Sequence, residues 1–321
     1  MADQQRLKIW LIENSEKYNI EFTELTWTKE IIPVISDFEC SIIFRSKKFI
    51  GRGSAFGKDL AMIKAFVEAF EGILVGEMKL KNSSGLAGHT NPLDAKLNSQ
   101  RELIERDTFL CHFLTGLKFP ETTAYTELIE SALNAFSKHK VTFSFYELSL
   151  SKTLDFSMVV ASGASAKDPW GMIMSTAVES GYENAQLKAF IEASRAVSHK
   201  IFKNDPLAKD IEEEPGFAAA GLKEHAQNAL ALNYIDKFRS NFKKSRIIPE
   251  YLSPEKITSE LLNFDILLEF KAMPLSYFIS TAVQYQPLYF GHNKSGANLN
   301  RLQNFLGSNQ FDLPTFLHPL R

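Results

Sequence analysis

The chain has 321 residues, of which 45% are hydrophobic and 23% charged, and its formal net charge is −2. This composition is typical of a soluble globular protein with one large domain or two ordinary ones. The near-neutral charge argues against a nucleic-acid partner, which would need a basic surface, and no apolar run of about 18 residues predicts a membrane-spanning helix.

Cysteine and histidine usage argues against zinc and disulfide sites. Cys40 and Cys111 are far apart and lack metal-ligand spacing, so we expect two buried thiols in the reducing cytoplasm. The seven histidines are scattered without an HExxH pattern. The first residues lack the apolar core of a signal peptide, which agrees with a cytoplasmic location.

In chain order, the first predicted elements are a short amphipathic helix over residues 7–18 and a strand from about Phe38 to Phe49. The strand is expected to end in a turn, followed by the segment Gly51-Arg52-Gly53-Ser54. Further predicted elements are a helix over about 58–76, a small-residue loop or closely packed strand over 83–88, and a helix from Asn91-Pro92 to about Leu114.

The second half of the chain mixes helical and strand patterns. Residues 141–149 alternate as a strand, and 154–162 and 172–178 are its expected neighbours in a hairpin arrangement. Because strands and helices alternate irregularly and form hairpins, we expect an α+β fold with mainly antiparallel sheets flanked by helices. The remaining predicted elements are helices over 122–138, 184–200 and 219–240, a loop over 204–217 with an acidic run, and a strand over 264–271.

Three of the predicted helices share one polar pattern. A polar residue is followed after four positions by a second and after seven by a third, so all three lie on one helix face. Apolar residues fill the other positions, which predicts amphipathic helices. The three segments are Ala61-Lys64-Glu68-Glu71, Ala95-Asn98-Glu102-Glu105 and Ala185-Lys188-Glu192-Arg195.

The shared stripe has two interpretations. In the first, three helices direct five carboxylates toward one place, where a cation must neutralise them. Magnesium suits oxygen ligands and commonly binds together with phosphates, so this interpretation predicts a nucleotide–magnesium site. In the second, these are ordinary surface helices with solvated charged faces, because Glu and Lys at this spacing are common.

These residues resemble the motifs of the YcaO family, ATP-dependent enzymes that modify peptides. Gly51-Arg52-Gly53 and the helix carrying Glu68-Ala69-Phe70-Glu71 are similar to the first family segment. Ser84-Gly85-Leu86-Ala87-Gly88 with Glu102-Leu103-Ile104-Glu105-Arg106-Asp107 closely resembles the second. Weaker matches are Ala185…Ala189…Glu192-Ala193-Ser194-Arg195 and the end of the chain, Ser295-Gly296-Ala297-Asn298-Leu299-Asn300 with His318-Pro319.

The resemblance implies a YcaO-like fold of repeated strand–helix units around a nucleotide site. It begins near residue 40, which suggests an N-terminal extension over 1–36 and a YcaO-like domain over 37–321 with an acidic linker near 205–216. It also implies that ATP and Mg²⁺ bind at this site. The implied metal ligands, which also contact the nucleotide, are Glu68, Glu71, Glu102, Glu105 and Glu192.

Other polar residues complete the implied site. The tail residues His318 and Pro319 are the expected catalytic pair, because proline stiffens the chain end and a histidine that titrates near neutrality can move a proton. Lys64 could instead pair with Glu68, and Arg106 with Glu102. The remaining expected nucleotide contacts are Arg52, Ser54, Lys64, Asn98, Arg106, Arg195 and Arg301.

The resemblance further implies the reaction and its partners. The nucleotide phosphorylates a peptide amide oxygen, and a neighbouring Cys, Ser or Thr attacks the carbonyl carbon to form an azoline in a ribosomal precursor peptide. Expected partners are that peptide, a separate leader-binding protein and a flavin-dependent azoline dehydrogenase; whether the chain forms a homo-oligomer is left open. Alternatives are a thioamide-forming enzyme that uses sulfide and a non-catalytic subunit.

Four departures from the family pattern bear on activity or substrate rather than on the fold. Arg52 stands where the family has Lys, which keeps the charge but changes phosphate geometry. Gly72 replaces an Arg, Arg195 replaces a Gln, and the tail keeps only one proline of the terminal motif.

Overall fold

The computed structural model describes residues 2–163, 171–203, 234–245, 249–262, 269–270, 272–289, 293–316 and 318–320. These fall into two compact units. Unit 1 comprises Met1–Leu103 and Ile257–Thr281, and unit 2 comprises Ile104–Lys256 and Ala282–Arg321. Helix α4 (Pro92–Thr115) begins in unit 1 and ends in unit 2. The predicted acidic loop over 204–217, most of the predicted helix over 219–240 and most of the predicted strand over 264–271 lie outside the described residues.

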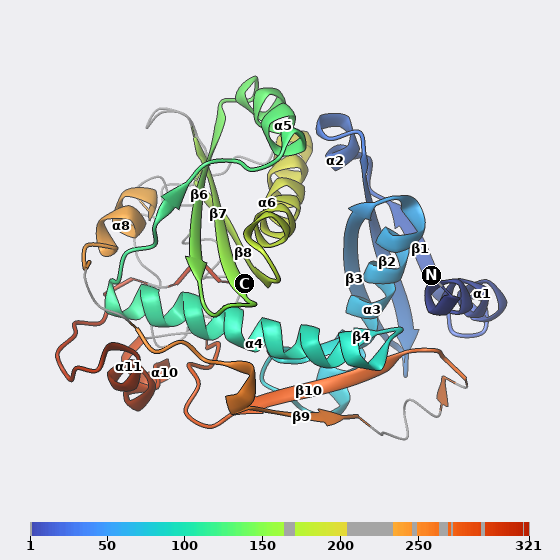
Figure 1. Cartoon of the computed structure of the whole chain (residues 1–321). Helices are drawn as coiled ribbons and strands as arrows, with labels where there is room; N and C mark the ends of the chain where they lie inside the picture. Colours follow the sequence, from blue (N-terminus) through green and yellow to red (C-terminus); the bar gives the residue numbers. More distant parts are fainter. Residues whose placement is uncertain are drawn as a thin grey trace. The chain divides into compact units, whose positions relative to one another are not determined.

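Unit 1 is built on an antiparallel sheet of three strands in the order β1 (Ile20–Glu24), β2 (Ile35–Phe44) and β3 (Lys47–Phe56). Helix α3 (Lys58–Glu77) packs against one face of this sheet (Figure 1). Apolar side chains from this face and from α1 (Ala2–Asn14) form the core, which includes Trp10, Phe66 and Phe70. The unit also contains α2 (Thr26–Ile31) and a second sheet, ordered β4 (Leu86–His89), β10 (Ser276–Ala282) and β9 (Ile257–Leu261).

Two N-terminal predictions need correction: the helix predicted over 7–18 spans Ala2–Asn14, and the single strand predicted from about Phe38 to Phe49 is divided between β2 and β3. The turn lies at Arg45 and Ser46, which have φ values of 47° and 64°, and Gly51–Ser54 continues as strand β3. Glycine is required at positions 51 and 53 because the backbone of α3 packs very close to this strand. A Cβ on Gly51 would lie 2.1 Å from the backbone nitrogen of Ala69, and one on Gly53 would lie 2.3 Å from the carbonyl oxygen of Ala61. These glycines suggested a turn from the sequence, whereas in the structure they allow close packing of a helix on a strand.

Unit 2 is built on a four-stranded antiparallel sheet, ordered β5 (Glu121–Thr122), β6 (Val141–Ser149), β7 (Asp155–Gly163) and β8 (Met172–Glu179). Helix α6 (Tyr182–Lys203) packs on this sheet (Figure 1). Its Phe190 ring contacts the rings of Phe143 and Phe145. The predicted strands and α6 are confirmed within two or three residues. The unit also contains α5 (Glu127–Ser137), α8 (Tyr234–Asn241), the 3₁₀ turn η2 (Pro254–Lys256), α10 (Asn293–Gly296) and α11 (Leu299–Leu306).

Helix α5 begins later than predicted because of its cap. The Thr126 side chain accepts a hydrogen bond from the backbone N–H of Ile129, which is the contact of an N-terminal cap. Thr122, predicted as the first residue of the helix, instead belongs to β5 with Glu121, and the two pair with Phe145 and Tyr146 of β6. Helix α11 and strands β9 and β10 were not predicted, since each is short and their segments carry weak patterns.

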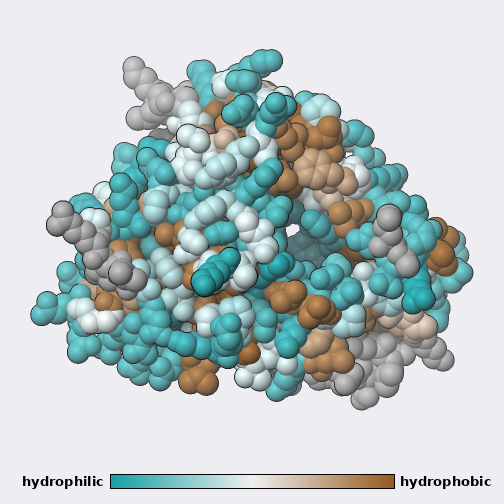
Figure 2. All heavy atoms as spheres, viewed as in Figure 1, coloured by the Kyte–Doolittle hydropathy of each residue, from teal (hydrophilic) through white to brown (hydrophobic). Residues whose placement is uncertain are grey.

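The α+β prediction with mainly antiparallel sheets is confirmed. Among the described helices, none combines the length and the apolar character needed to cross a membrane. Figure 2 shows hydrophobic patches interspersed with hydrophilic ones on the face in view. Scattered apolar atoms of this kind are usual on protein surfaces and mark no interface by themselves.

The aromatic core of unit 2 encloses a histidine on α4. His112 is buried and stacks on Phe119 with 4.2 Å between ring centroids. Its Nδ1 lies 3.0 Å from the carbonyl oxygen of Leu117, and its Nε2 lies 3.1 Å from the hydroxyl of Tyr251. Burial lowers the pKa of His112 to about 3, although the contact with Leu117 opposes this shift. His112 is therefore neutral in the folded protein at physiological pH.

Substituting Gly51 should test the close contact between α3 and β3. We expect Gly51→Ala to lower the free energy of unfolding by about 1 to 3 kcal/mol, because the added methyl group overlaps backbone atoms. Gly72→Ala on α3 is the matched control, since its Cβ would lie 3.6 Å from the Phe49 ring and alanine favours helix by about 1 kcal/mol. Urea unfolding of both variants measures this, and equal stabilities would contradict the packing argument.

His112 should make stability depend on pH. Its pKa is about 3 when folded and near 6.5 when unfolded, so between these values the unfolded chain binds a proton that the folded chain does not. The stabilisation is complete above pH 6.5 and is lost as the pH falls toward 3, at about 1.4 kcal/mol per pH unit. Urea unfolding at several pH values should show a smaller pH slope for His112→Gln. His139→Gln, at an exposed histidine, should keep the parent slope.

Candidate functional site

The first acidic cluster lies in unit 1, on α3. Glu68 Oε2 accepts a hydrogen bond from the backbone N–H of Arg52 at 3.0 Å. Glu71 Oε1 accepts one from the backbone N–H of Gly88 at 2.8 Å. Bonds from N–H groups to carboxylates are stronger than neutral ones, so they hold both acids in place. The segment over residues 51–53 therefore supports Glu68, which follows it, and the segment over residues 84–88 supports Glu71, which precedes it.

Glu71 shares its surroundings with two further carboxylates. Burial raises the pKa of Glu71 well above its ordinary value, the negative charges of Glu102 and Glu68 raise it further, and the Gly88 hydrogen bond acts in the opposite direction. Glu102 comes from α4, four residues after the partly buried Asn98. Carboxylates that repel one another away from water are stabilised by a cation, and Mg²⁺ prefers oxygen ligands. These carboxylates are thus of the ligand type that Mg²⁺ prefers, and binding of the ion by this cluster stays a prediction.

The β3 residues predicted to contact nucleotide turn their side chains away from α3. Successive side chains alternate between the faces of a strand, and Gly51 and Gly53 face the helix. The Arg52 guanidinium donates to Glu39 at 3.0 Å, and the Ser54 hydroxyl donates to Asp37 at 2.8 Å. The backbones of these two residues, in contrast, contact side chains of α3. Lys64 Nζ lies 3.4 Å from the carbonyl oxygen of Ser54, and the Glu68 carboxylate accepts a hydrogen bond from the backbone N–H of Arg52. Nucleotide contact by the Arg52 and Ser54 side chains stays a prediction.

The second acidic cluster lies in unit 2, between α4, α6 and β8. The Thr176 hydroxyl donates to Glu105 Oε1 at 2.6 Å, and the Ser175 hydroxyl donates to Glu192 Oε2 at 3.0 Å. Burial raises the pKa of Glu105 and the charge of Glu192 raises it further, whereas Arg106 and Lys188 lower it. Each acid is thus oriented by a hydroxyl group of β8.

Lys188 is the internal cation of this second cluster. Its Nζ donates to Glu179 Oε1 at 3.0 Å. Burial opposes its charge, but Glu179, Glu192 and Glu105 outweigh this effect and raise its pKa. Sequence reasoning placed Lys188 on the polar stripe without a role in the site. It missed Ser175, Thr176 and Glu179, because polar residues of a half-buried strand have no pattern of their own.

Two arginines of the expected nucleotide site lie on the helices that carry this cluster. Arg106, which lowers the pKa of its neighbour Glu105, is partly buried, and its Nε has no hydrogen-bond partner among the described residues. A buried N–H donor of this kind fits an anionic ligand such as a phosphate. Arg195 is partly buried on α6, seven residues after Lys188.

The five predicted metal ligands do not form a ready coordination cage. Within the part of the chain that the structure describes, no group of three or more His, Cys, Asp or Glu is arranged to hold a metal ion. The acids instead belong to the two clusters: Glu68, Glu71 and Glu102 in unit 1, and Glu105 and Glu192 in unit 2. Metal binding by these residues stays a prediction.

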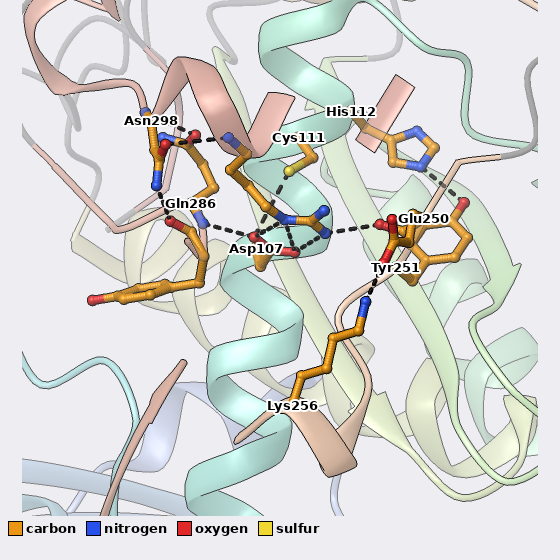
Figure 3. Close-up of polar contacts among 10 residues, drawn as sticks. Asp107, Cys111, His112, Glu250, Tyr251, Lys256, Gln286 and Asn298 are labelled. Atoms are coloured by element: carbon orange, nitrogen blue, oxygen red, sulfur yellow. Dashed lines mark hydrogen bonds and ion pairs between the residues drawn. The ribbon is translucent and has the colours of Figure 1, made fainter. Parts of the chain in front are cut away.

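Arg301 forms a buried ion pair. Its NH2 and Nε groups donate to Asp107 of α4 at 2.6 and 2.9 Å, and both side chains are nearly inaccessible to water. Asp107 also accepts a hydrogen bond from the backbone N–H of Gln286 at 2.7 Å (Figure 3). Arg301 therefore has a structural partner that the sequence did not reveal, and its contact with a nucleotide stays a prediction.

The tail residues predicted to be catalytic are buried in unit 2. His318 packs edge-on against Phe113 and Tyr289, and its Nε2 lies 2.7 Å from the carbonyl oxygen of Tyr289. Pro319 and Leu320 are also buried. Residues 318–320 are therefore part of the core of this unit, and removing them should cost stability. The catalytic role of His318 and Pro319 stays a prediction.

Comparison with known proteins gives matches in structure only. No family model and no curated protein matches the sequence. YcaO from Methanopyrus kandleri, solved with AMPPCP and Mg²⁺, superposes with a TM-score of 0.58 at 10% identity, over 88% of this chain and 91% of that one. A heterocyclase in complex with substrate and cofactor also gives 0.58 at 10% identity, over 85% of this chain and 52% of that one.

A third solved structure agrees with these two. The E. coli microcin synthetase McbBCD complex contains a chain that superposes with a TM-score of 0.56 at 9% identity. The match covers 87% of this chain and 93% of that one. At such low identity the similarity concerns the arrangement of helices and strands, and it confirms the resemblance of the motifs at that level. The chain has the fold of the YcaO proteins.

Proposed function

We propose that this protein is an ATP-dependent cyclodehydratase of the YcaO type, which forms azolines from Cys, Ser or Thr residues of a ribosomal precursor peptide. The observation that carries the proposal is the first acidic cluster. Glu68 and Glu71 are each fixed by a backbone N–H of a family-like glycine segment, and Glu102 lies close enough to repel Glu71. Such a cluster needs a cation, and Mg²⁺ brings phosphates with it.

Each part of the two clusters has a task in this reaction. The proposed Mg²⁺ ligands are Glu68, Glu71 and Glu102 of the first cluster and Glu105 and Glu192 of the second. Bound Mg²⁺ would supply the positive charge that neutralises the phosphates of ATP. Arg106 donates its buried N–H to a phosphate oxygen, and Lys188 limits repulsion between Glu105 and Glu192. Phosphoryl transfer needs mainly positioning and charge neutralisation, which fixed acids and cations supply.

The transferred phosphoryl group makes the peptide amide reactive. The amide oxygen attacks the γ-phosphorus of ATP and ADP leaves; the neighbouring thiol or hydroxyl then attacks the amide carbon and loses its proton. Phosphate departs with the former amide oxygen while the amide nitrogen releases its proton and forms the C=N bond, so the peptide loses one oxygen and two hydrogens, equal to one water. His318 is proposed to move the proton of the attacking group, and Pro319 to hold the chain end in place.

The superposed structures support the nucleotide and the partners. The Methanopyrus kandleri protein was solved with AMPPCP and Mg²⁺, and the heterocyclase with substrate and cofactor. The E. coli microcin synthetase is a complex of several subunits. We therefore propose a precursor peptide as substrate and a separate leader-binding protein as partner, together with a flavin-dependent dehydrogenase that oxidises azolines.

Glu71 should be required for nucleotide binding. We expect Glu71→Gln to weaken binding of AMPPCP with Mg²⁺ by about tenfold or more, because a neutral amide cannot balance the metal charge. Glu77→Gln is the matched control: Glu77 ends the same helix and pairs with Arg45 at the surface. Isothermal titration calorimetry measures both variants. If Glu71→Gln bound as tightly as Glu77→Gln, the assignment of the first cluster would be wrong.

Peptide modification should require ATP and accelerate with the leader-binding partner. The partner holds the leader, so the flexible core peptide spends more time near the nucleotide. Mass spectrometry of a Cys-, Ser- and Thr-rich peptide encoded beside this gene should show loss of water, coupled to phosphate release. A product containing sulfur from added sulfide would select thioamide formation, and ATP binding without turnover would select a non-catalytic subunit.

A further inference from the structure

Asp107 of α4 is the polar centre of the C-terminal part of unit 2. Its carboxylate accepts hydrogen bonds from the Arg301 side chain and from the backbone N–H of Gln286, and the Cys111 thiol lies 3.8 Å away (Figure 3). Asp107 is fully buried and Arg301 is 6% exposed. Neither the sequence pattern nor the proposed reaction assigns a task to Asp107.

The segments that meet Asp107 are themselves tied together. Asn298 caps α11 by accepting a hydrogen bond from the backbone N–H of Arg301. Its own backbone N–H donates to the Gln286 side chain, and its Nδ2 donates to the carbonyl oxygen of Tyr285. Arg301 also donates to the carbonyl oxygen of Glu250 at 2.9 Å. The C-terminal segment around α11 is thus organised about one carboxylate of α4.

Asp107 and Glu105 leave α4 on opposite sides. Consecutive residues of an α-helix are about 100° apart, so two positions separate the side chains by about 200°. The hydrogen bonds agree with this geometry: Glu105 is bound by Thr176 of β8, whereas Asp107 is bound by α11 and Gln286. One turn of α4 is therefore held on both sides within unit 2, and Arg106 lies between the two attachments.

Burying this ion pair contributes little to the stability of the fold. Desolvation cancels much of the attraction between buried charges, and apolar replacements of such pairs are often neutral or stabilising. What an ion pair adds is a directional, two-point contact that permits one arrangement. Here the contact fixes the turn of α4 that carries Glu105 and Arg106.

We propose that Asp107 is a positioning residue, which clamps α4 to the C-terminal segment and so holds Glu105 and Arg106 in the orientation that binds nucleotide. This inference rests on the proposed function, since it names a residue that acts through the second acidic cluster. Asp107 itself touches neither the nucleotide nor the peptide.

The test is Asp107→Asn, which keeps the shape of the side chain and its acceptor for Gln286 but removes the charge opposite Arg301. We expect the affinity for AMPPCP with Mg²⁺ to fall by about 10- to 100-fold, the scale for losing a residue that orients a ligand. Asp94→Asn is the matched control, because Asp94 lies exposed in the first turn of the same helix and should leave affinity unchanged. The double variant Asp107→Asn/Arg301→Gln, which removes both charges, should recover part of the affinity.

Hydrogen exchange separates positioning from a purely structural role. In Asp107→Asn, exchange should rise both in α11 and in the turn of α4 around Glu105, and both should be suppressed again in the double variant. The proposal is overturned if only α11 exchanges faster, or if the single variant binds the analogue as tightly as Asp94→Asn. If the parent protein binds no analogue, the proposed function fails, and exchange at α4 alone decides whether Asp107 positions this turn.

Discussion

The close contact between helix α3 and strand β3 is the constraint on which the first acidic cluster depends. Only residues without a Cβ permit it, since a Cβ on Gly51 would lie 2.1 Å from the Ala69 nitrogen. The contact brings the backbone N–H of Arg52 to the carboxylate of Glu68. On the same helix, Glu71 accepts a hydrogen bond from the backbone N–H of Gly88. This contact joins the first and second segments of the family-like pattern. The close approach of helix and strand at a glycine thus determines where the Glu68 carboxylate lies.

The second cluster achieves the same rigidity by other means. Hydroxyl groups of β8 orient Glu105 and Glu192, and Lys188 supplies a positive charge from within the chain. All three helices of the polar stripe therefore carry acids that accept hydrogen bonds from residues outside the stripe. The charges of Glu68 and Glu102 raise the pKa of Glu71, whereas Arg106 and Lys188 lower the pKa of Glu105.

The departures from the family pattern have different structural weight. A Cβ at Gly72 would meet only the edge of the Phe49 ring, so the position tolerates a side chain and its glycine is not needed for packing. The Arg52 side chain pairs with Glu39 on the sheet face away from α3, and its backbone contacts the acid. The tail residues His318 and Leu320 are buried. None of the three disturbs the hydrogen bonds that fix Glu68 and Glu71.

The sequence by itself determined the long elements and the order of the acids. Helices α3, α4 and α6 and strands β6 to β8 follow from side-chain periodicity, which is local and survives without knowledge of the fold. The motifs in order indicated the YcaO fold. Only the tertiary structure decided that Gly51 and Gly53 lie in a strand, that the Arg52 side chain faces away from Glu68, and that Arg301 pairs with Asp107 across 194 residues. These depend on which backbones and charges meet in space, and no spacing along a single chain encodes that.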